Sequence, residues 1–592
     1  MEIVPGIKLA VQNILADKYN YRIDIQEVLI NETKPEFAGD YTVVLFSFSK
    51  ILKISPGELG RGLGDDLLNS KPGWFTGYNI IKGFLNLVLD DRILLDLLCG
   101  QYNNSAFGKR AANGRRVMVE YSSPNTNKPL HLGHLRNNFL GWSVAALYKA
   151  CGYGIVKTCI ANDRGIHICK SMVAWKLFAH GATPESTGIK GDHFVGDYYV
   201  LFGIELKKQM DAAVATGLSV EMAEKEAPLM KAAQQMLVDW EAGKPDVIEL
   251  WQKMNNWVYS GFDITYKRIG SDFDKIYYES QTYLLGKNLV EMGLKKKVFF
   301  QKDDGSVWID LKPDGLDEKI VRRSDGTAVY ITQDIGLAVE KFEEFHANLS
   351  IYVVADEQNY HFKVLELICQ KLELPSAAGI YHLSYGLVEL PSGRMKTREG
   401  TVVDADDIID EMIAIAAKHT EELGKVADFT KEEITELYDT IGLGALKFFM
   451  LRVDPKKRMV FNPDESIDFH GFTGPFIQYT YARISSILKR EKVRDFPVQD
   501  MTDLLPLEKE LLKSLEKYGS LLVQACSEMN PSLVANYVFN TAKIFNSFYA
   551  EHSVNKAESE NKKQLRLRTC VMTANVIKSS MELLGIKVPE RM

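Results

Sequence analysis

The chain has 592 residues and a mass of 66.8 kDa, which is enough for about three or four domains. Hydrophobic residues make up 46% and charged residues 25% of the chain, so a disordered chain, a collagen and a small disulfide scaffold are excluded. No apolar run reaches the roughly 18 residues that a membrane-spanning helix needs, and we therefore expect no membrane partner.

The net charge of −7 is unevenly distributed along the chain. Residues 441–592 contain 22 Lys and Arg against 17 Asp and Glu, whereas the remainder contains 49 against 61. A basic C-terminal region on an acidic body can bind a polyanion, because contacts with phosphate are local. The charge alone also fits a solvated helical surface.

The cysteines argue against a disulfide framework and against a zinc ribbon. They are odd in number, scattered, and contain no C-x-x-C pair: Cys99, Cys151, Cys159, Cys169, Cys369, Cys526 and Cys570. We expect reduced, mostly buried thiols in a cytoplasmic protein, with no protein-bound zinc and no dedicated metal site.

Residues 1–110 mix helical and strand patterns. Residues 6–17 have the apolar spacing of an amphipathic helix and not of a signal peptide. Residues 41–48 are rich in β-branched and aromatic side chains, which favours a strand, although a helix is possible. The polar stretch 103–116 contains Gly108 and Gly114 and predicts a linker.

The next region alternates between strand and helix. Residues 117–121, 154–160, 351–355 and 383–390 are predicted strands, and residues 133–150 are a predicted helix. Strands separated by helices imply a doubly wound, Rossmann-like parallel sheet with ligands at the carboxyl ends of the strands.

We predict a multidomain α/β protein with four parts. An N-terminal α+β module covers residues 1–110, and a Rossmann-like catalytic domain covers 111–403, with a mostly helical insertion around 181–269. A helical connection follows over 404–440, and an all-α domain covers 441–592.

The sharpest motif is His131-Leu132-Gly133-His134, which follows a strand-like run and a Ser-Pro turn and opens a helix. The free N–H groups and the dipole of a helix N-terminus attract phosphate. Gly133 leaves room for a flat base on the backbone, and the two imidazoles can donate to phosphate oxygens as charge builds in a transition state. The motif alone also fits two structural histidines.

A second motif is the basic loop at residues 393–400. Arg394, Lys396 and Arg398 place three cations within five residues, and glycines flank them. This pattern suits a clamp on a polyphosphate. Taken alone, it fits a solvated basic turn equally well.

Together, these two motifs resemble the HIGH and KMSKS motifs of the class I aminoacyl-tRNA synthetases. The surrounding sequence is similar to the bacterial type of arginyl-tRNA synthetase. The similarity is carried, in chain order, by residues 35–41, 120–136, 162–167, 474–479 and 589–592. Because these segments keep the order of that family, the resemblance extends over nearly the whole chain.

The basic loop departs from the family pattern. Arg394 stands where the KMSKS motif usually has Lys, Lys396 replaces its central Ser, and the final Lys is absent. In this family Lys128, upstream of the HIGH motif, is thought to supply the missing cation. A planar guanidinium is not a point charge like an ammonium, so the division of roles among these cations stays open.

The resemblance also implies an arginine pocket. Tyr330 and Asp334 match the family's Y-x-T-x-D, and their i, i+4 spacing puts both side chains on one face of a helix. Further matches by position are Asn125, Glu279 and Gln358. Carboxylates with oriented acceptors are the groups that recognise a guanidinium best.

The remaining matches concern tRNA. The N-terminal module resembles the one that touches the tRNA elbow in this family, and residues 441–592 resemble its anticodon-binding domain. The residues that we expect to bind tRNA there are Tyr479, Tyr481, Arg483, Arg566 and Met592. Aromatic faces stack on splayed bases, and cations bind phosphates.

The resemblance therefore implies an enzyme that activates L-arginine with ATP and Mg²⁺ and transfers it to the 3′ end of tRNA. We expect a cytoplasmic monomer. Another H-x-G-H nucleotidylyltransferase is a weaker alternative, because those enzymes are far shorter and lack a basic helical tail. A catalytically silent tRNA-binding paralogue is the other alternative, which the unusual loop at Arg394 and Lys396 keeps open.

Overall fold

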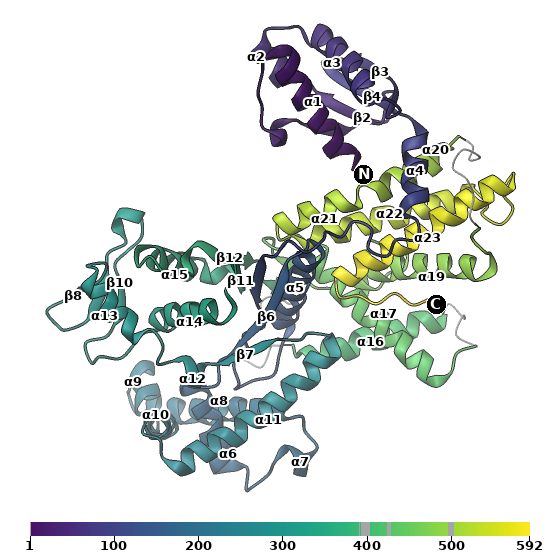
Figure 1. The fold of residues 1–592 in the computed structure, drawn as a ribbon. Coiled ribbons are helices and arrows are strands. Elements are labelled where there is room, and N and C mark those ends of the chain that lie inside the picture. The colour runs from purple at the N-terminus through teal and green to yellow at the C-terminus, as the bar shows by residue number, and fades with distance from the viewer. Residues whose placement is uncertain (1, 390, 392–402, 423–427, 495–502) are drawn as a thin grey trace.

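A computed structural model describes residues 2–389, 391, 403–422, 428–494 and 503–592 (Figure 1). The predicted phosphate clamp, with Arg394, Lys396 and Arg398, lies outside the described residues. Within the described ranges, no helix is both long enough and apolar enough to span a membrane.

The N-terminal module is an antiparallel sheet with helices packed on it. Its strands are in the order β1-β2-β4-β3. The elements are α1 (Ile3–Tyr19), η1 (Ile25–Glu27), β1 (Ile30–Glu32), β2 (Tyr41–Val44), α2 (Phe46–Leu52), α3 (Pro56–Ser70), β3 (Phe75–Ile81), β4 (Phe84–Leu89) and α4 (Asp91–Gln101). The helix expected at residues 6–17 is confirmed as α1.

The strand predicted at residues 41–48 is confirmed only for its first half, residues 41–44. Strand β2 ends at Val44, which pairs with Phe84, the first residue of β4. Beyond Val44 the pairing ends with a hydrogen bond from the Leu45 N–H to Gly83 O, in the turn before β4, and the chain enters α2. The ring of Phe46 then packs edge-on against Phe84 at 5.3 Å.

The centre of the molecule is a five-stranded, fully parallel sheet in the order β12-β11-β5-β6-β7 (Figure 1). Its strands are β5 (Arg116–Glu120), β6 (Gly154–Ala161), β7 (Lys275–Tyr278), β11 (Leu349–Ala355) and β12 (Ile380–Tyr385). Helix α5 (Leu132–Ala150) connects β5 with β6, as the sequence predicts. The strand β7 was not predicted, because it has only four residues and a helix follows it directly at Glu279.

The predicted strand at 383–390 is displaced and divided. Strand β12 ends at Tyr385, where it pairs with Ala355, the last residue of β11. The backbone N–H of Gly386 then donates to Pro455 O at 2.9 Å, which turns the chain away from the sheet. Strand β13 (Val388–Glu389) pairs instead with β14 (Met459–Val460).

Two groups of elements are inserted between strands of this sheet. Between β6 and β7 lie α6 (Ile166–Phe178), α7 (Pro184–Thr187), α8 (Gly191–Ala215), α9 (Val220–Glu226), α10 (Pro228–Glu241) and α11 (Pro245–Ile269), in keeping with the helical character expected there. Between β7 and β11 lie α12 (Glu279–Thr282), α13 (Lys287–Lys295), β8 (Phe300–Gln301), β9 (Val307–Ile309), η2 (Lys312–Asp314), β10 (Lys319–Arg322) and α14 (Tyr330–Phe345). The connection from β11 to β12 contains η3 (Asp356–Gln358), α15 (Asn359–Lys371) and η4 (Ala377–Gly379). The small sheet β10-β9-β8 has its own apolar core.

The C-terminal region is helical, with α16 (Ala405–Glu422), α17 (Lys431–Leu451), α18 (Pro463–Ser466), α19 (Gly474–Arg490), α20 (Pro506–Glu516), α21 (Tyr518–Ser527), α22 (Pro531–Glu551) and α23 (Glu560–Leu583). Capping side chains define several of these helix starts. Thr430, Thr473 and Asn530 each accept a hydrogen bond from a backbone N–H of the first turn. Such a cap contributes about 1 kcal/mol.

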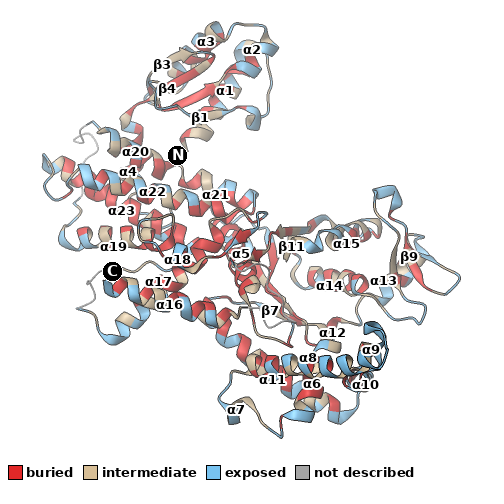
Figure 2. Cartoon of the chain, turned by 180° about the vertical axis from the view of Figure 1, so that it is seen from behind, coloured by how far each residue is buried: buried red, intermediate tan, exposed pale blue. Residues whose placement is uncertain are grey.

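The N-terminal module rests on the helical region at α20 (Figure 2). The Asp40 carboxylate lies 3.0 Å from Lys513 Nζ and 3.1 Å from Lys509 Nζ. Burial alone would raise the pKa of Asp40, but the two lysines and the Leu89 N–H lower it. The backbone N–H of Ile3 donates to Glu516 Oε1 at 2.6 Å. The N-terminal module and α20 are thus joined by ion pairs and a buried hydrogen bond.

Candidate active site and RNA-binding surface

The H-x-G-H motif forms the first turn of α5. His131 is the N-cap, and its Nδ1 accepts from the Gly133 N–H at 3.2 Å. His134 Nδ1 accepts from the His131 N–H at 3.2 Å, so the two rings cap the helix reciprocally and lie 4.0 Å apart. A Cβ on residue 133 would lie only 3.1 Å from the His131 ring, which favours glycine there.

Both histidines are neutral hydrogen-bond donors at physiological pH. Burial lowers the pKa of His131 to about 3, and the charge of Lys128 adds to the shift. Burial, His131 and Lys128 hold the pKa of His134 well below its usual range. Because each Nδ1 already accepts a backbone N–H, the single ring proton belongs on Nε2. The pair therefore presents two Nε2–H donors at a helix N-terminus.

The loop that leads to the motif is strained and is held by α5. Ser122 and Ser123 have φ angles of +78° and +47°, in the left-handed region. Such residues cost about 1–3 kcal/mol each and persist only where their surroundings fix them. Here the Ser122 N–H donates to Asn137 Oδ1 at 2.5 Å, and Ser122 Oγ lies 3.1 Å from Asn138 Nδ2 and 2.6 Å from the Tyr266 hydroxyl.

Asn125 and Lys128 lie at the carboxyl edge of the sheet. Asn125 is exposed and forms a parallel bridge with Asn162, which follows β6. Lys128 is half-buried, and this burial lowers the pKa of its ammonium. The loops after β5 and β6 thus meet at the edge where parallel sheets bind ligands.

A buried aspartate next to this edge fixes the position of α12. Asp163 is 1% exposed. Its carboxylate accepts from the Ser280 N–H at 2.8 Å, from Ser280 Oγ at 2.7 Å and from the Tyr259 hydroxyl at 2.9 Å. Because Ser280 directly follows Glu279, its hydrogen bonds to Asp163 also fix the backbone position from which the Glu279 side chain extends. Sequence reasoning did not single out Asp163 itself, although residues 162–167, which contain it, are among the segments that carry the family resemblance.

The two predicted guanidinium-binding carboxylates are close enough to interact. Burial raises the pKa of Glu279 to about 7; Arg164 opposes this shift, and the charges of Asp163 and Asp334 add to it. Asp334 Oδ2 lies 2.6 Å from His361 Nε2, a partner that sequence reasoning missed. A pair of crowded carboxylates of this kind favours a cationic ligand.

Tyr330 and Gln358 complete the predicted pocket from two other positions. Tyr330 is the first residue of α14 and is 71% exposed, one helical turn before Asp334. Gln358 is exposed at the end of η3, directly after β11. Their polar groups lie in solvent, where a ligand at this edge of the sheet can reach them.

The place that the family resemblance gives Glu279, beside the guanidinium of arginine, predicts that arginine binding depends on pH. With a pKa of about 7, it is mostly protonated below that pH and must ionise to pair with a guanidinium. We therefore expect the KM for arginine to fall about tenfold as the pH rises from about 6 to about 8. In Glu279→Gln the KM should be high at every pH. Pyrophosphate exchange at several pH values in this range gives the KM. An equally steep pH dependence of the KM in Glu279→Gln would contradict the assignment of Glu279 to the guanidinium.

Three of the predicted tRNA-binding residues share one pocket of about 540 Å³ in the helical region. Its lining includes Tyr479, Arg483, Tyr549, Arg591 and Met592. The Arg483 guanidinium lies 4.9 Å from the centre of the Tyr479 ring and 5.7 Å from that of Tyr549. Two aromatic faces beside two arginines suit an unstacked base and its phosphate.

The other two predicted residues lie elsewhere. Tyr481 is partly buried and packs against the hydrophobic core. Arg566 is 1% exposed, and its guanidinium donates to Glu508 Oε1 and Glu558 Oε1, both at 2.9 Å. A buried arginine whose guanidinium already donates to two carboxylates of its own chain is not available to a phosphate. We therefore leave Arg566 out of the proposed tRNA surface.

The pocket predicts a salt-dependent contact. Replacing Arg483 with Ala should weaken tRNA binding and reduce the slope of log Kd against log salt by about one, because one phosphate contact is lost. Titrations of tRNA at several salt concentrations give the slope. Lys543→Ala is the matched control, since Lys543 is exposed on α22 outside the pocket lining. A slope that does not change in Arg483→Ala would indicate a base contact or a purely structural role.

Known proteins resemble this chain over its whole length. Residues 98–462 match the family model described as tRNA synthetases class I (R), catalytic domain, and residues 477–592 match the DALR anticodon binding domain. An arginine–tRNA ligase from Amoebophilus asiaticus is 49% identical over 597 residues, which cover 100% of both chains. One from Flavobacterium psychrophilum is 49% identical over 601 residues, with 99% of each chain covered.

Solved structures show the same fold. The arginyl-tRNA synthetase of Thermus thermophilus superposes with a TM-score of 0.80 at 22% identity and covers 99% of both chains. The enzyme from Plasmodium falciparum superposes with a TM-score of 0.80 at 18% identity and covers 100% of both chains.

Proposed function

The chain belongs to the arginyl-tRNA synthetases, and we propose that it joins L-arginine to the 3′ end of tRNA with ATP as the energy source. The observation that carries this function in the structure is the pair of neutral Nε2–H donors on the first turn of α5, together with two interacting carboxylates, Glu279 and Asp334, of which Glu279 directly follows β7 of the same sheet. The first feature suits a phosphate, and the second suits a guanidinium.

The first chemical step would be in-line attack of the arginine carboxylate on the α-phosphate of ATP. An oxygen of the carboxylate bonds to phosphorus, and the bond to the departing pyrophosphate breaks. The reacting groups supply the covalent chemistry, so the protein acts by orientation and by charge stabilisation. His131 and His134 would donate from Nε2 to the α-phosphate oxygens, where negative charge develops.

Cations would hold the pyrophosphate as it departs. Lys128 lies at the sheet edge, and its half-buried ammonium is a strong donor to phosphate. Arg394, Lys396 and Arg398 stay part of this proposal on the family resemblance alone, because they lie outside the described residues. Mg²⁺ would arrive as part of the MgATP substrate and would offset the negative charge of its phosphates.

Arginine would be held by its two ends. Asp334 and Glu279 would pair with the guanidinium, and Tyr330 would lie beside it. Gln358 and Asn125, at the ends of β11 and β5, would bind the α-amino group. The aminoacyl group would then pass to a terminal ribose hydroxyl of tRNA, with release of AMP.

Aminoacylation of total tRNA with each of the twenty amino acids in turn tests this function. We expect charging with arginine and background with the others. Because the family activates arginine only with tRNA bound, pyrophosphate exchange should stay near background until tRNA is added. A protein that binds tRNA but releases no pyrophosphate with arginine, ATP and tRNA would be the silent paralogue instead.

A further inference from the structure

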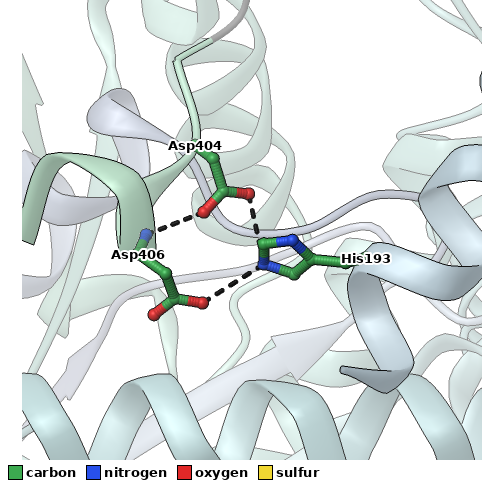
Figure 3. A group of neighbouring side chains, drawn as sticks. All are labelled: His193, Asp404 and Asp406. Atoms are coloured by element: carbon green, nitrogen blue, oxygen red, sulfur yellow. Dashed lines mark hydrogen bonds and ion pairs between the residues drawn. The ribbon is translucent and has the colours of Figure 1, made fainter. Parts of the chain in front are cut away.

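A cluster of polar side chains joins the helical insertion to the segment that follows the basic loop. It contains Lys190, Asp192 and His193 at the start of α8, Thr265 in α11, and Asp404 and Asp406 at the start of α16. Figure 3 shows the His193 ring between the carboxylates of Asp404 and Asp406. We refer to these six residues as the α8–α16 cluster.

The cluster is closely connected. Lys190 Nζ donates to Asp406 Oδ2 at 2.7 Å, to Asp192 Oδ2 at 2.9 Å and to Thr265 Oγ1 at 2.6 Å. His193 Nε2 lies 3.2 Å from Asp406 Oδ2 and 3.4 Å from Asp404 Oδ2. Asp404 Oδ1 in turn accepts from the Asp406 N–H at 2.7 Å, which caps α16.

His193, Asp404 and Asp406 are residue types that also bind metal ions, and their ligand atoms lie within 4.8 Å of one another. Here, however, the ammonium of Lys190 already lies on Asp406 and Asp192. The cluster thus contains its own cation. Three carboxylates against one lysine still leave excess negative charge, which a protonated His193 would reduce.

The backbone beside this cluster pairs with the H-x-G-H motif. Residues His131 and Asp404 form an antiparallel bridge. The Ala405 N–H donates to Leu130 O at 3.0 Å, and the Leu132 N–H donates to Val403 O at 3.3 Å. The backbone around His131 is therefore held on one side by residues 403–405.

Helix α8 also packs directly on the segment before the motif. A Cβ added to Gly196 would lie 2.8 Å from Pro129 Cδ and 3.6 Å from Lys128 Cα. A Cβ added to Gly261 of α11 would lie 2.2 Å from Asp192 Oδ1. These close approaches leave little freedom for α8 to shift against α11 or against Lys128.

We propose that Lys190, His193 and Asp406 are positioning residues for adenylate formation: they fix residues 403–405, which hold His131 and, through the reciprocal cap, His134. This inference rests on the proposed role of the histidine pair. A shift of about 1 Å in a catalytic group can cost on the order of 10²-fold in rate. The cluster would thus act on the rate of the chemical step and not on arginine affinity.

The first test compares Asp406→Asn with His193→Gln in pyrophosphate exchange with saturating tRNA. We expect kcat per titrated active site to fall about tenfold to 10²-fold in Asp406→Asn, with the arginine KM within about twofold of wild type. If Asp406→Asn folds poorly, His193→Gln takes its place, because His193 is only half-buried. The kcat of His193→Gln should also fall. The matched control is His419→Gln, because His419 is a half-buried histidine near the other end of α16, where its ring lies 3.7 Å from the Glu422 carboxylate.

The pH dependence of kcat distinguishes a positioning role of His193 from a merely structural one. The hydrogen bond to Asp406 raises the pKa of His193; burial opposes the shift, Asp404 and Asp192 add to it, and Lys190 lowers it. Of the neighbouring groups, Asp197 also faces this ring. The raised pKa keeps His193 protonated to a higher pH than an ordinary histidine, and kcat should fall as the pH rises through that pKa. His193→Gln should lack this alkaline limb.

A double-mutant cycle separates this inference from the proposed function. In a His131→Ala background, Asp406→Asn should cost no more than about twofold in kcat, since both changes act through one group. Full additivity, or unchanged kcat in both single variants of the cluster, would overturn the inference. If Asp406→Asn lowers kcat while His131→Ala leaves it unchanged, two proposals fail. His131 then has no role in the chemical step, and the cluster acts on kcat by a route that does not pass through His131.

Discussion

Replacing His134 with Asn should lower kcat for adenylate formation about 10²–10³-fold and leave the KM for arginine nearly unchanged. Loss of one donor to a developing oxyanion typically costs about 2.7–4 kcal/mol. The asparagine Oδ1 can replace Nδ1 as the acceptor of the His131 N–H, so the helix cap is kept. What is lost is the Nε2–H, which only the transition state uses fully. Pyrophosphate exchange and single-turnover adenylation measure the effect.

His134→Gln provides the comparison for that result. Its side-chain amide can place an N–H near the position of Nε2, so part of the rate should return, although the cap is weakened. Loss of a cap costs about 0.5–2 kcal/mol of stability, which thermal unfolding measures. A rate that follows thermal stability across the two variants, and not the presence of the distal donor, would show that His134 acts only as a cap.

Replacing Asp334 with Asn should raise the KM for arginine by about 30-fold. Breaking a buried hydrogen-bonded charge pair costs about 2–5 kcal/mol, and we take about 2 kcal/mol because the Asp334 side chain is 38% exposed. Asparagine keeps the shape and can keep an acceptor for His361, but it removes the charge that faces the guanidinium. The preference for arginine over citrulline should fall in parallel, since citrulline no longer leaves a carboxylate unpaired.

Pyrophosphate exchange with arginine and with citrulline, at saturating tRNA, gives both KM values. Glu343→Gln is the matched control, because Glu343 is an exposed carboxylate on the same helix, α14. An Asp334→Asn enzyme with the wild-type arginine KM would place the guanidinium somewhere other than at Asp334. Glu279 would then be the next carboxylate to test, because it interacts with Asp334 in the structure.

Local sequence patterns were sufficient to predict the framework of the active site. The strand predictions at residues 117–121, 154–160 and 351–355 correspond to β5, β6 and β11, because short apolar β-rich runs bounded by turns are local signals. The start of α5 at His131 was equally visible, since a capping residue followed by a helical period lies within a few residues.

Predictions that depended on distant partners were less successful. The strand at residues 41–48 ends early because β4 begins at Phe84, which nothing near Val44 in the sequence reveals. Arg566 lies in a basic stretch that suggests an exposed surface, yet Glu508, 58 residues earlier, holds it inside the domain. Exposure of a charged side chain is decided by its long-range partners.

The family motifs, the alternation of strands and helices, and the basic character of the C-terminal region were therefore all visible in local sequence patterns. Which charges meet is a property of the folded structure. The fold buries Glu279, which raises the pKa of its carboxyl, and brings it close enough to Asp334 to add to that shift. It also places Lys190 on Asp406, 216 residues away. The physical reason is that ionisation and orientation depend on burial and on neighbours within a few ångströms, and chain folding supplies both from remote segments.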